Sequence, residues 1–366
     1  MQHTAFIRTK VLLLFFIVCY ISSFGQFRAK EVNWTKDGTG FYQADRQTIQ
    51  RINPQAAQPV TALVSPARLT PGGSMAPLDV ADFEISADDN ILLIFTNTAK
   101  VWRYRTRGDY WILNRATGQL RQVGKGKPSQ SLMYAKLSPD AKKVAYVSER
   151  NIYVEDVNTG TTIALTTDGT RQLINGTFDW VYEEEFGCRD GFRWSSDSKS
   201  IAYWQVDARK TRDYLMLNTT DSIYSFVVPV EYPKVGEPPS IVRIGVVSAG
   251  GGKTTWMNIP GDPQQHYLPR MEWTGDDHTL IVQQLNRKQN ESKIFVCAAD
   301  RGTAKDIYIE TDKAWIDIKS RWNDDDPVGW EWINGGKDFL WVSEKDGWRH
   351  IYRISADGKK EVLLTQ

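Results

Sequence analysis

One pattern of apolar and polar positions recurs six times along the 366-residue chain. Each copy opens with a large apolar residue, continues into a polar turn, and leads into a short apolar run. Serine, threonine, aspartate and glycine are frequent in these turns, because their side chains bond to the backbone or because they tolerate positive φ. The six apolar anchors are Trp34, Ile85, Leu137, Trp194, Trp273 and Trp332.

Short strands are expected after these turns. Brief runs rich in β-branched and aromatic residues, bounded by turn signals, are typical of strands. The first strands are expected at residues 91–95, 144–147, 201–204, 280–282 and 339–342. A second strand follows a short polar link at residues 151–156, 293–297 and 349–354. The sequence therefore predicts a series of antiparallel meanders.

The spacing of the anchors indicates the architecture. They are 51, 52, 57, 79 and 59 residues apart, which suits a four-stranded propeller blade with insertions better than a solenoid turn. No long segment has helical periodicity. We therefore expect an all-β fold, a β-propeller. Because the sequence stops just after a strand, at residues 363–366, we also expect it to be truncated before the ring closes.

Composition agrees with a globular fold and limits the partners. The chain is 41% apolar and 24% charged, which provides a core without the bias typical of disorder. Lysine and arginine number 45 against 44 acidic residues, and no long block has one sign. An extended basic surface for nucleic acid has no support, so we expect no nucleic-acid partner.

The first residues have the pattern of an export signal. Arg8 and Lys10 precede an apolar run at residues 11–21, and Ser23 and Gly25 then place small residues where a signal peptidase reads them. We expect residues 1–25 to be a signal peptide, and the protein to be exported, either periplasmic or secreted. Membrane anchoring by residues 11–21 is the weaker interpretation, because a helix that spans a bilayer needs about 20 residues.

Two cysteines, Cys188 and Cys297, remain after removal of such a signal. In an exported protein they can form one disulfide, and two separate buried thiols are an equally good interpretation. The sequence has no CxxC motif and nothing else that suggests a metal site, so we predict neither a metal nor a cofactor.

Three consecutive carboxylates, Glu183, Glu184 and Glu185, stand out in this sequence. Most acidic runs are solvated surface, but apolar neighbours here favour burial, and a buried carboxylate requires a cation or several donors. Two adjacent carboxylates can converge on one ligand only from a helical turn or irregular segment, so we expect a short insertion between blades. The protonated α-amino group of a peptide, with three N–H donors, matches such a pair. The flanking apolar residues are Trp180, Val181, Tyr182 and Phe186.

The segment around the triplet closely resembles the signature of the dipeptidyl peptidase IV family, the S9B group of serine peptidases. It reads Asp-Trp-Val-Tyr-Glu-Glu-Glu at residues 179–185, and residues 100–104, 230–236 and 347–351 resemble further family segments in the same order. The resemblance runs from about residue 34 to the end. It implies that residues 26–366 are an incomplete N-terminal propeller of the family's eight-bladed type, without the C-terminal catalytic domain.

The resemblance also implies roles for three residues. In that family the second and third glutamates of the triplet bind the amino group of the substrate, which corresponds to Glu184 and Glu185. The arginine of a Trp-Arg segment, here Arg103, contacts the substrate backbone and the acidic pair. A guanidinium at this place favours the ionised form of neighbouring carboxylates. Without the resemblance, Arg103 would be an ordinary surface arginine at the end of a strand.

Catalysis in that family belongs to a C-terminal α/β-hydrolase domain with a GxSxG nucleophile elbow. The sequence contains no GxSxG motif, and its nearest equivalent, around Ser74, lies in a proline-rich segment that we interpret as a loop. Of the histidines beyond the signal, His266, His278 and His350, none is a credible general base. We therefore expect no catalytic residue here.

The function implied by the resemblance is that of a substrate-binding propeller. It would belong to an exported serine dipeptidyl peptidase that removes N-terminal X-Pro or X-Ala dipeptides. Its expected partners are peptide N-termini, the C-terminal hydrolase domain of a full-length chain, and a second copy in a homodimer. Two alternatives stay open: a noncatalytic binding or scaffold propeller similar to TolB-like periplasmic proteins, and an inactive homologue that still binds peptides.

Overall fold

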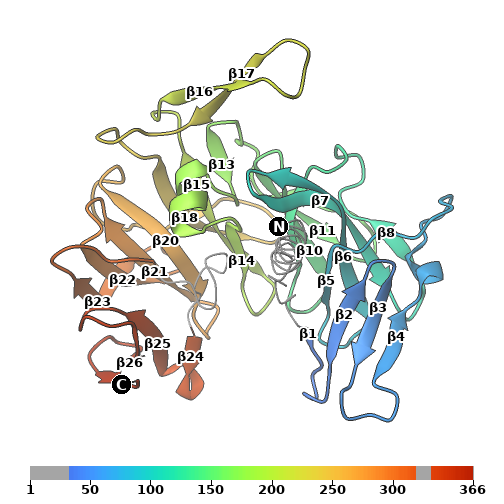
Figure 1. Ribbon diagram of the computed structural model, residues 1–366. Coiled ribbons are helices and arrows are strands. Elements are labelled where there is room, and N and C mark those ends of the chain that lie inside the picture. Colours follow the sequence, from blue (N-terminus) through green and yellow to red (C-terminus); the bar gives the residue numbers. More distant parts are fainter. Residues whose placement is uncertain (1–32, 319–330, 366) are drawn as a thin grey trace, which may run out of the picture.

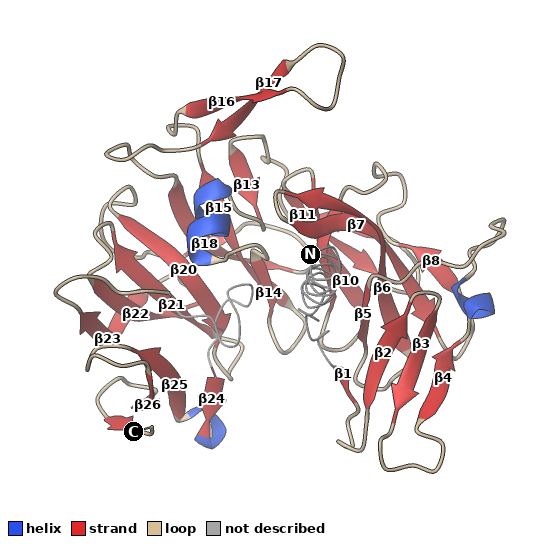
Figure 2. Cartoon of the chain, viewed as in Figure 1, coloured by secondary structure: helices blue, strands red, loops and turns tan. Residues whose placement is uncertain are grey.

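The computed structural model describes residues 33–318 and 331–365. The expected signal peptide, residues 1–25, lies outside these ranges. Within them the chain is built almost wholly of strands, with one α-helix, α2 (Trp180–Phe186), and the short 3₁₀ turns η1 (Pro66–Leu69) and η2 (Asn334–Gly336) (Figure 2). No helix of the described residues is long and apolar enough to cross a membrane. The predicted all-β class is confirmed.

Six successive antiparallel meanders form the blades of an open arc (Figure 1). Blade 1 contains β1 (Asn33–Trp34), β2 (Phe41–Asp45), β3 (Thr48–Ile52) and β4 (Val60–Val64). Blade 2 contains β5 (Asp82–Ile85), β6 (Ile91–Val101), β7 (Tyr104–Asn114) and β8 (Leu120–Gln122). Blade 3 contains β9 (Leu132–Leu137), β10 (Lys143–Ser148), β11 (Asn151–Asp156) and β12 (Thr162–Ala164). A short pairing of β7 with β9 joins blades 2 and 3 into one sheet.

The second half of the arc follows the same plan. Blade 4 contains β13 (Leu173–Asn175), β14 (Phe192–Trp194), β15 (Ser200–Asp207), β18 (Ile241–Ser248) and β19 (Thr255–Trp256). Blade 5 contains β20 (His266–Trp273), β21 (Thr279–Asn286), β22 (Glu291–Ala298) and β23 (Ala304–Thr311). Blade 6 contains β24 (Glu331–Ile333), β25 (Asp338–Ser343), β26 (His350–Ser355) and β27 (Glu361–Leu363). Blades 1 and 6 lie at opposite ends of the arc, and no strand of the described residues pairs one with the other.

A separate hairpin, which we call the arm, leaves blade 4 between β15 and β18. It consists of β16 (Asp213–Asn218) and β17 (Phe226–Glu231) and forms a two-stranded sheet of its own. The arm projects away from the arc (Figure 1). Its insertion contributes to the longest spacing between anchors, the 79 residues from Trp194 to Trp273.

The predicted repeat is confirmed strand by strand. Five of the six anchors are the last residue of the first strand of their blades, and Trp332 is the second-last residue of β24. The turn that follows is built alike in blades 1 to 5, where a serine or threonine hydroxyl donates to an aspartate two residues later. In blade 3, Ser138 Oγ donates to Asp140 at 2.7 Å and accepts the N–H of Lys143 at 3.0 Å. The corresponding serine bond lowers the pKa of Asp197 in blade 4.

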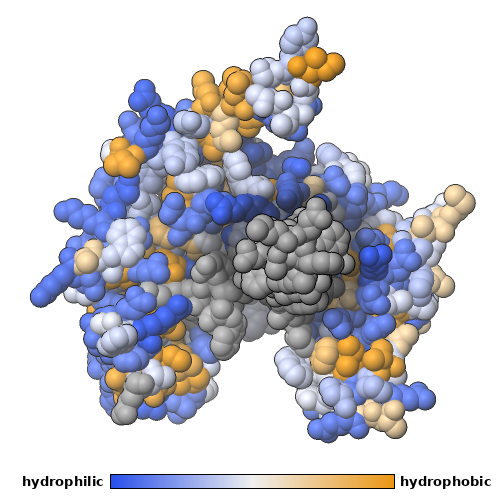
Figure 3. Space-filling view, in the orientation of Figure 1, coloured by the Kyte–Doolittle hydropathy of each residue, from blue (hydrophilic) through white to orange (hydrophobic). Residues whose placement is uncertain are grey.

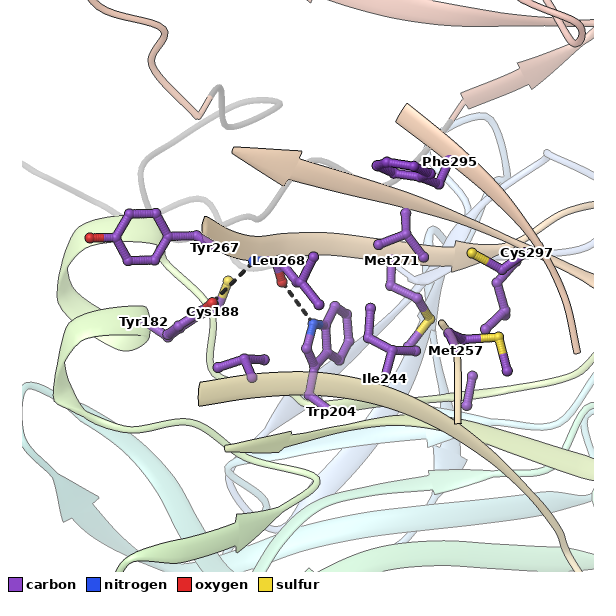
Figure 4. Close-up of a cluster of buried hydrophobic side chains, with 14 of the residues drawn as sticks. Tyr182, Cys188, Trp204, Ile244, Met257, Tyr267, Leu268, Met271, Phe295 and Cys297 are labelled. Carbon is purple, nitrogen blue, oxygen red and sulfur yellow. Dashed lines mark hydrogen bonds between the residues drawn. The ribbon is translucent and has the colours of Figure 1, made fainter. Parts of the chain in front are cut away.

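Apolar packing joins each blade to the next. Each pair of neighbouring blades shares one cluster of buried side chains, and the most extensive cluster lies between blades 4 and 5. That cluster contains Trp204, Tyr267 and both cysteines (Figure 4). Cys188 and Cys297 are buried free thiols. Of the two alternatives from the sequence, the structure therefore shows two separate buried thiols and not a disulfide.

Polar contacts follow the same repeat. The residue before an anchor reaches across to the next blade: Lys136 Nζ donates to Asp190 at 2.6 Å, and Arg193 Nε donates to Glu272 at 3.1 Å. An anchor can also bond to the preceding blade: the indole of Trp273 in blade 5 donates to the Arg193 carbonyl in blade 4 at 3.1 Å. These bonds satisfy polar groups on or next to the first strands of the blades and link each blade to its neighbour.

Candidate functional site

The acidic triplet lies on α2, so the predicted helical turn is confirmed. The expected position between blades is wrong, because α2 interrupts the first strand of blade 4. The two halves of that strand, β13 and β14, pair with successive stretches of β15, as in Asn175↔Gln205 and Phe192↔Tyr203. The helix is therefore an insertion within one strand position, and the sheet continues on both sides of it.

Both ends of α2 are defined by local chemistry. At the N-terminus, Asp179 Oδ1 accepts the N–H of Tyr182 at 3.1 Å, and Ser240 Oγ donates to Asp179 Oδ2 at 2.6 Å. Aspartate is a favoured N-cap because its carboxylate satisfies an N–H that lacks a partner within the helix. At the C-terminus, Gly187 adopts the left-handed conformation with φ of 65°, which glycine reaches without steric cost.

The inner face of α2 is aromatic and locked by a hydrogen bond. Tyr182 and Phe186 are buried in the cluster between blades 4 and 5. The hydroxyl of Tyr182 accepts the N–H of Leu268 on β20 at 3.0 Å, while the Trp204 indole donates to the Leu268 carbonyl at 2.8 Å (Figure 4). Rotation of the helix would leave a buried N–H without a partner, at a cost of about 1–3 kcal/mol.

This anchoring places the three carboxylates at different depths. The side chain of Glu183 is 7% exposed and that of Glu184 is 16% exposed, whereas Glu185 is an exposed residue. The expected burial of the whole triplet is therefore wrong for Glu185. The reason is helical geometry, because with about 3.6 residues per turn three consecutive side chains cannot all face inward.

Arg103 reaches α2 from blade 2. It lies with Trp102 in the two-residue turn between β6 and β7, which is closed by the pairing of Val101 with Tyr104. Its Nη2 atom is 3.0 Å from Glu184 Oε2. Arg103 and Glu184, which are 81 positions apart in the sequence, thus form an ion pair.

Glu185 lies beside this pair on the same helix. It faces solvent. The pKa of the Tyr267 phenol is raised, mainly because the ring is buried, and the negative charge of Glu185 contributes to the increase. The structure therefore gathers the three predicted site residues around one end of α2. Of these three residues, Arg103 and Glu184 are the two for which the described part of the chain shows an ion pair.

Sequence reasoning assigned no role to the contacts beneath the pair. Arg189, in the loop after α2, has its guanidinium carbon 3.7 Å from the centroid of the Tyr104 ring. Its Nε atom is 3.7 Å from Glu183 Oε1. Burial raises the pKa of Glu183 to about 7, against the opposing effect of Arg189 and with a further increase from Glu184. The helical period alone could have distinguished Glu183 from its exposed neighbour Glu185. The contact of Arg189 with Tyr104 could not be predicted in this way, because the two residues are far apart in the sequence.

A cleft of about 500 Å³ lies next to these residues. Its wall includes Trp102, Tyr134, Trp180, Glu183 and Arg189. Trp102 directly precedes Arg103, and Glu183 directly precedes Glu184, so the ion pair stands beside this cleft. Aromatic walls with a few charged groups are typical of ligand sites.

The remaining candidates from the sequence have ordinary structural places. Ser74 lies in the loop between η1 and β5, where its hydroxyl donates to the Ala76 carbonyl at 2.8 Å. His266 lies in β20, His350 lies in β26, and His278 lies in the turn between β20 and β21. Within residues 33–318 and 331–365, no three histidine, cysteine, aspartate or glutamate side chains are grouped so that they could hold a metal ion.

Comparison with known proteins identifies relatives of this chain. A family model described as the dipeptidyl peptidase IV (DPP IV) N-terminal region matches residues 86–366. The inactive dipeptidyl peptidase 10 of Rattus norvegicus is 25% identical over 346 residues, which cover 92% of this chain and 42% of that protein. The dipeptidyl peptidase 4 of Trichophyton tonsurans is 26% identical over 302 residues, which cover 79% of this chain and 38% of that protein.

A solved structure agrees with both the fold and the family. The crystal structure of Porphyromonas gingivalis dipeptidyl peptidase 4 superimposes with a TM-score of 0.82 and 27% identity, covering 92% of this chain and 47% of that one. The chain thus spans less than half the length of these relatives. One of these relatives is named an inactive dipeptidyl peptidase, and the other two are named dipeptidyl peptidase 4.

The raised pKa of Glu183 predicts how stability depends on pH. Between its ordinary value of 4.5 and about 7, the folded protein keeps a proton that the unfolded chain releases. Stability should therefore fall as pH rises through this range, because deprotonation leaves a buried charge. Glu183→Gln imitates the neutral acid, so its melting temperature relative to the wild type should rise between pH 5 and pH 8.

Thermal unfolding followed by circular dichroism at both pH values measures this difference. Glu185→Gln removes the same charge from the exposed side of α2 and controls for the altered charge of the helix. A Glu183→Gln advantage that is constant or shrinks toward pH 8 would show that Glu183 is ionised throughout.

Proposed function

The chain belongs to the dipeptidyl peptidase IV N-terminal region family, and we propose that it is the substrate-binding propeller of an exported serine dipeptidyl peptidase. In this proposal Glu184 and Glu185 bind the α-amino group of a peptide. Arg103 pairs with Glu184 and contacts the peptide backbone. The observation that carries the proposal is the ion pair between Arg103 and Glu184, with 3.0 Å between Nη2 and Oε2. Glu184 lies on a helix that buried aromatic residues hold in place.

The chemistry of the pair suits an ammonium ligand. A peptide amino group has a pKa of about 8 and is mostly protonated at neutral pH, with three N–H donors. Glu184 is partly buried, so its bond to an ammonium group is less screened by water than a bond at the open surface. Glu185 remains accessible and can supply a second acceptor. The Arg103 side chain is 74% exposed, which leaves much of its guanidinium available to a ligand.

Fixing the amino group would also set the length of the product. Two residues of extended chain span about 7 Å. A peptide held at α2 would therefore present its second peptide bond at a defined distance from the anchor, and dipeptides would be released. A preference for X-Pro or X-Ala and the catalytic serine, aspartate and histidine are assigned in this proposal to a C-terminal α/β-hydrolase domain of the full-length gene product. Export follows from the pattern of residues 1–25.

The test compares full-length protein carrying Glu184→Gln or Glu185→Gln with the wild type. Substrates are a Gly-Pro amide with a free amino group and its N-acetylated form. Each substitution removes a charge-assisted hydrogen bond, so we expect kcat/KM for the free amine to fall about 10- to 100-fold, while the slow cleavage of the acetylated substrate stays the same. Glu237→Gln, at a half-buried glutamate that pairs with Arg212, is the control and should match the wild type.

The outcomes distinguish the alternatives. If the free amine keeps its advantage in both variants, the anchoring role is wrong. A wild type that binds but does not hydrolyse a tripeptide, with binding lost in Glu184→Gln, indicates the inactive homologue. A wild type that does neither, whatever the amino group, indicates the noncatalytic TolB-like propeller.

The arm favours a second copy of the protein as a further partner. Both faces of β16 are open, and the arm pairs with no other sheet among the described residues. Apolar side chains gather on it (Figure 3). An isolated hairpin is marginal in water, and contiguous exposed apolar patches mark interaction sites. The most exposed large apolar residues of the arm are Leu215, Leu217, Ile223, Tyr224 and Val227.

Light scattering during size exclusion tests this interface in the full-length protein. We expect a homodimer that becomes a monomer in the double variant Leu215→Glu, Leu217→Glu, because two buried charges would oppose association. Val235→Glu, at a fully exposed residue just beyond the arm, is the control. A wild type that elutes as a monomer contradicts the homodimer.

A further inference from the structure

The placement of Arg103 needs an explanation beyond its own ion pair. Its side chain is 74% exposed, and it lies at the tip of a long hairpin. Exposed ion pairs contribute about 0–1 kcal/mol, because water screens them and two long side chains lose freedom. Arg103 is the exposed member of its pair, whereas the Glu184 side chain is only 16% exposed, so the pair alone restrains the hairpin only in part. A second contact can restrain the tip further.

Arg189 supplies that contact. Its guanidinium carbon lies 3.7 Å from the centroid of the Tyr104 ring, and its side chain is only 13% exposed. Tyr104 is the first residue of β7 and directly follows Arg103. A cation–π contact reaches about 2 kcal/mol when it is removed from water, which is more than an exposed ion pair contributes.

The same guanidinium also lies close to α2. Its Nε atom is 3.7 Å from Glu183 Oε1, and Glu183 directly precedes Glu184. Each member of the exposed ion pair is thus the sequence neighbour of a residue in contact with Arg189. The left-handed Gly187 ends the helix two residues earlier and turns the chain back, which lets Arg189 pass beneath α2.

We propose that Arg189 is a positioning residue, which stacks on Tyr104 and thereby holds the tip of the β6–β7 hairpin at the distance from α2 that the ammonium site requires. This inference rests on the proposed function of Glu184, Glu185 and Arg103. The planar guanidinium is essential to it, because a lysine ammonium cannot lie flat on the ring. Arg189 itself touches no substrate in this account.

Hydrogen–deuterium exchange of the full-length protein tests the positioning without any need for activity. Arg189→Met and Tyr104→Leu should each raise exchange in residues 99–106, while the blades keep their protection. Tyr104→Phe keeps the ring and should match the wild type. Arg103→Met removes the exposed ion pair but leaves the stack, so the tip should stay protected. Unchanged exchange at the tip in Arg189→Met, or equal loss in Arg103→Met, would overturn the proposal.

Kinetics with the free-amine substrate then connect positioning to binding. We expect KM to rise about tenfold in Arg189→Met and Tyr104→Leu with little change in kcat, and Arg189→Lys to restore less of the affinity than Tyr104→Phe retains. If Glu184→Gln raises KM and Arg189→Met does not, the positioning role fails and the ammonium site stands. If neither variant changes KM, the proposed function fails, and the exchange experiment still decides whether Arg189 holds the hairpin.

Discussion

The hydrogen bond between the Tyr182 hydroxyl and the Leu268 N–H sets the orientation of α2, and the site depends on that orientation. The helix has only seven residues, so it has little stability of its own. Its place comes from burying Tyr182 and Phe186 between blades 4 and 5. Once those two rings point inward, the positions of the carboxylates follow. Glu183 is buried, Glu184 is partly buried and Glu185 is exposed to solvent.

The second requirement is that blade 2 reaches a helix inserted in blade 4. Blade 3 lies between them, and apolar clusters join it to both neighbours. The strands β6 and β7 have 11 residues each, whereas β5 beside them has four. The extra length carries Arg103 beyond the sheet to Glu184. The spacing of the site is therefore a property of three blades, and it inherits its rigidity from the clusters between them.

The periodic features of the fold could be predicted from the sequence. Anchors such as Trp194 and Trp273 end the first strand of blades 1 to 5, because a large apolar side chain before a Ser/Thr-x-Asp turn is a local signal. The helical turn at the triplet also follows from a local requirement. The split of one strand into β13 and β14 could not be predicted, because both halves pair with β15 far along the chain. The stack of Arg189 on Tyr104 was missed for the same reason.

In the proposed function, α2 holds the amino terminus of a peptide. A crystal structure of the full-length protein with a bound, uncleaved tripeptide decides whether it does. We expect the ammonium nitrogen to lie about 2.7–3.2 Å from carboxylate oxygens of both Glu184 and Glu185, with Arg103 directed at the peptide backbone. A peptide whose amino group lies away from α2, with the Arg103–Glu184 pair unchanged, would contradict it.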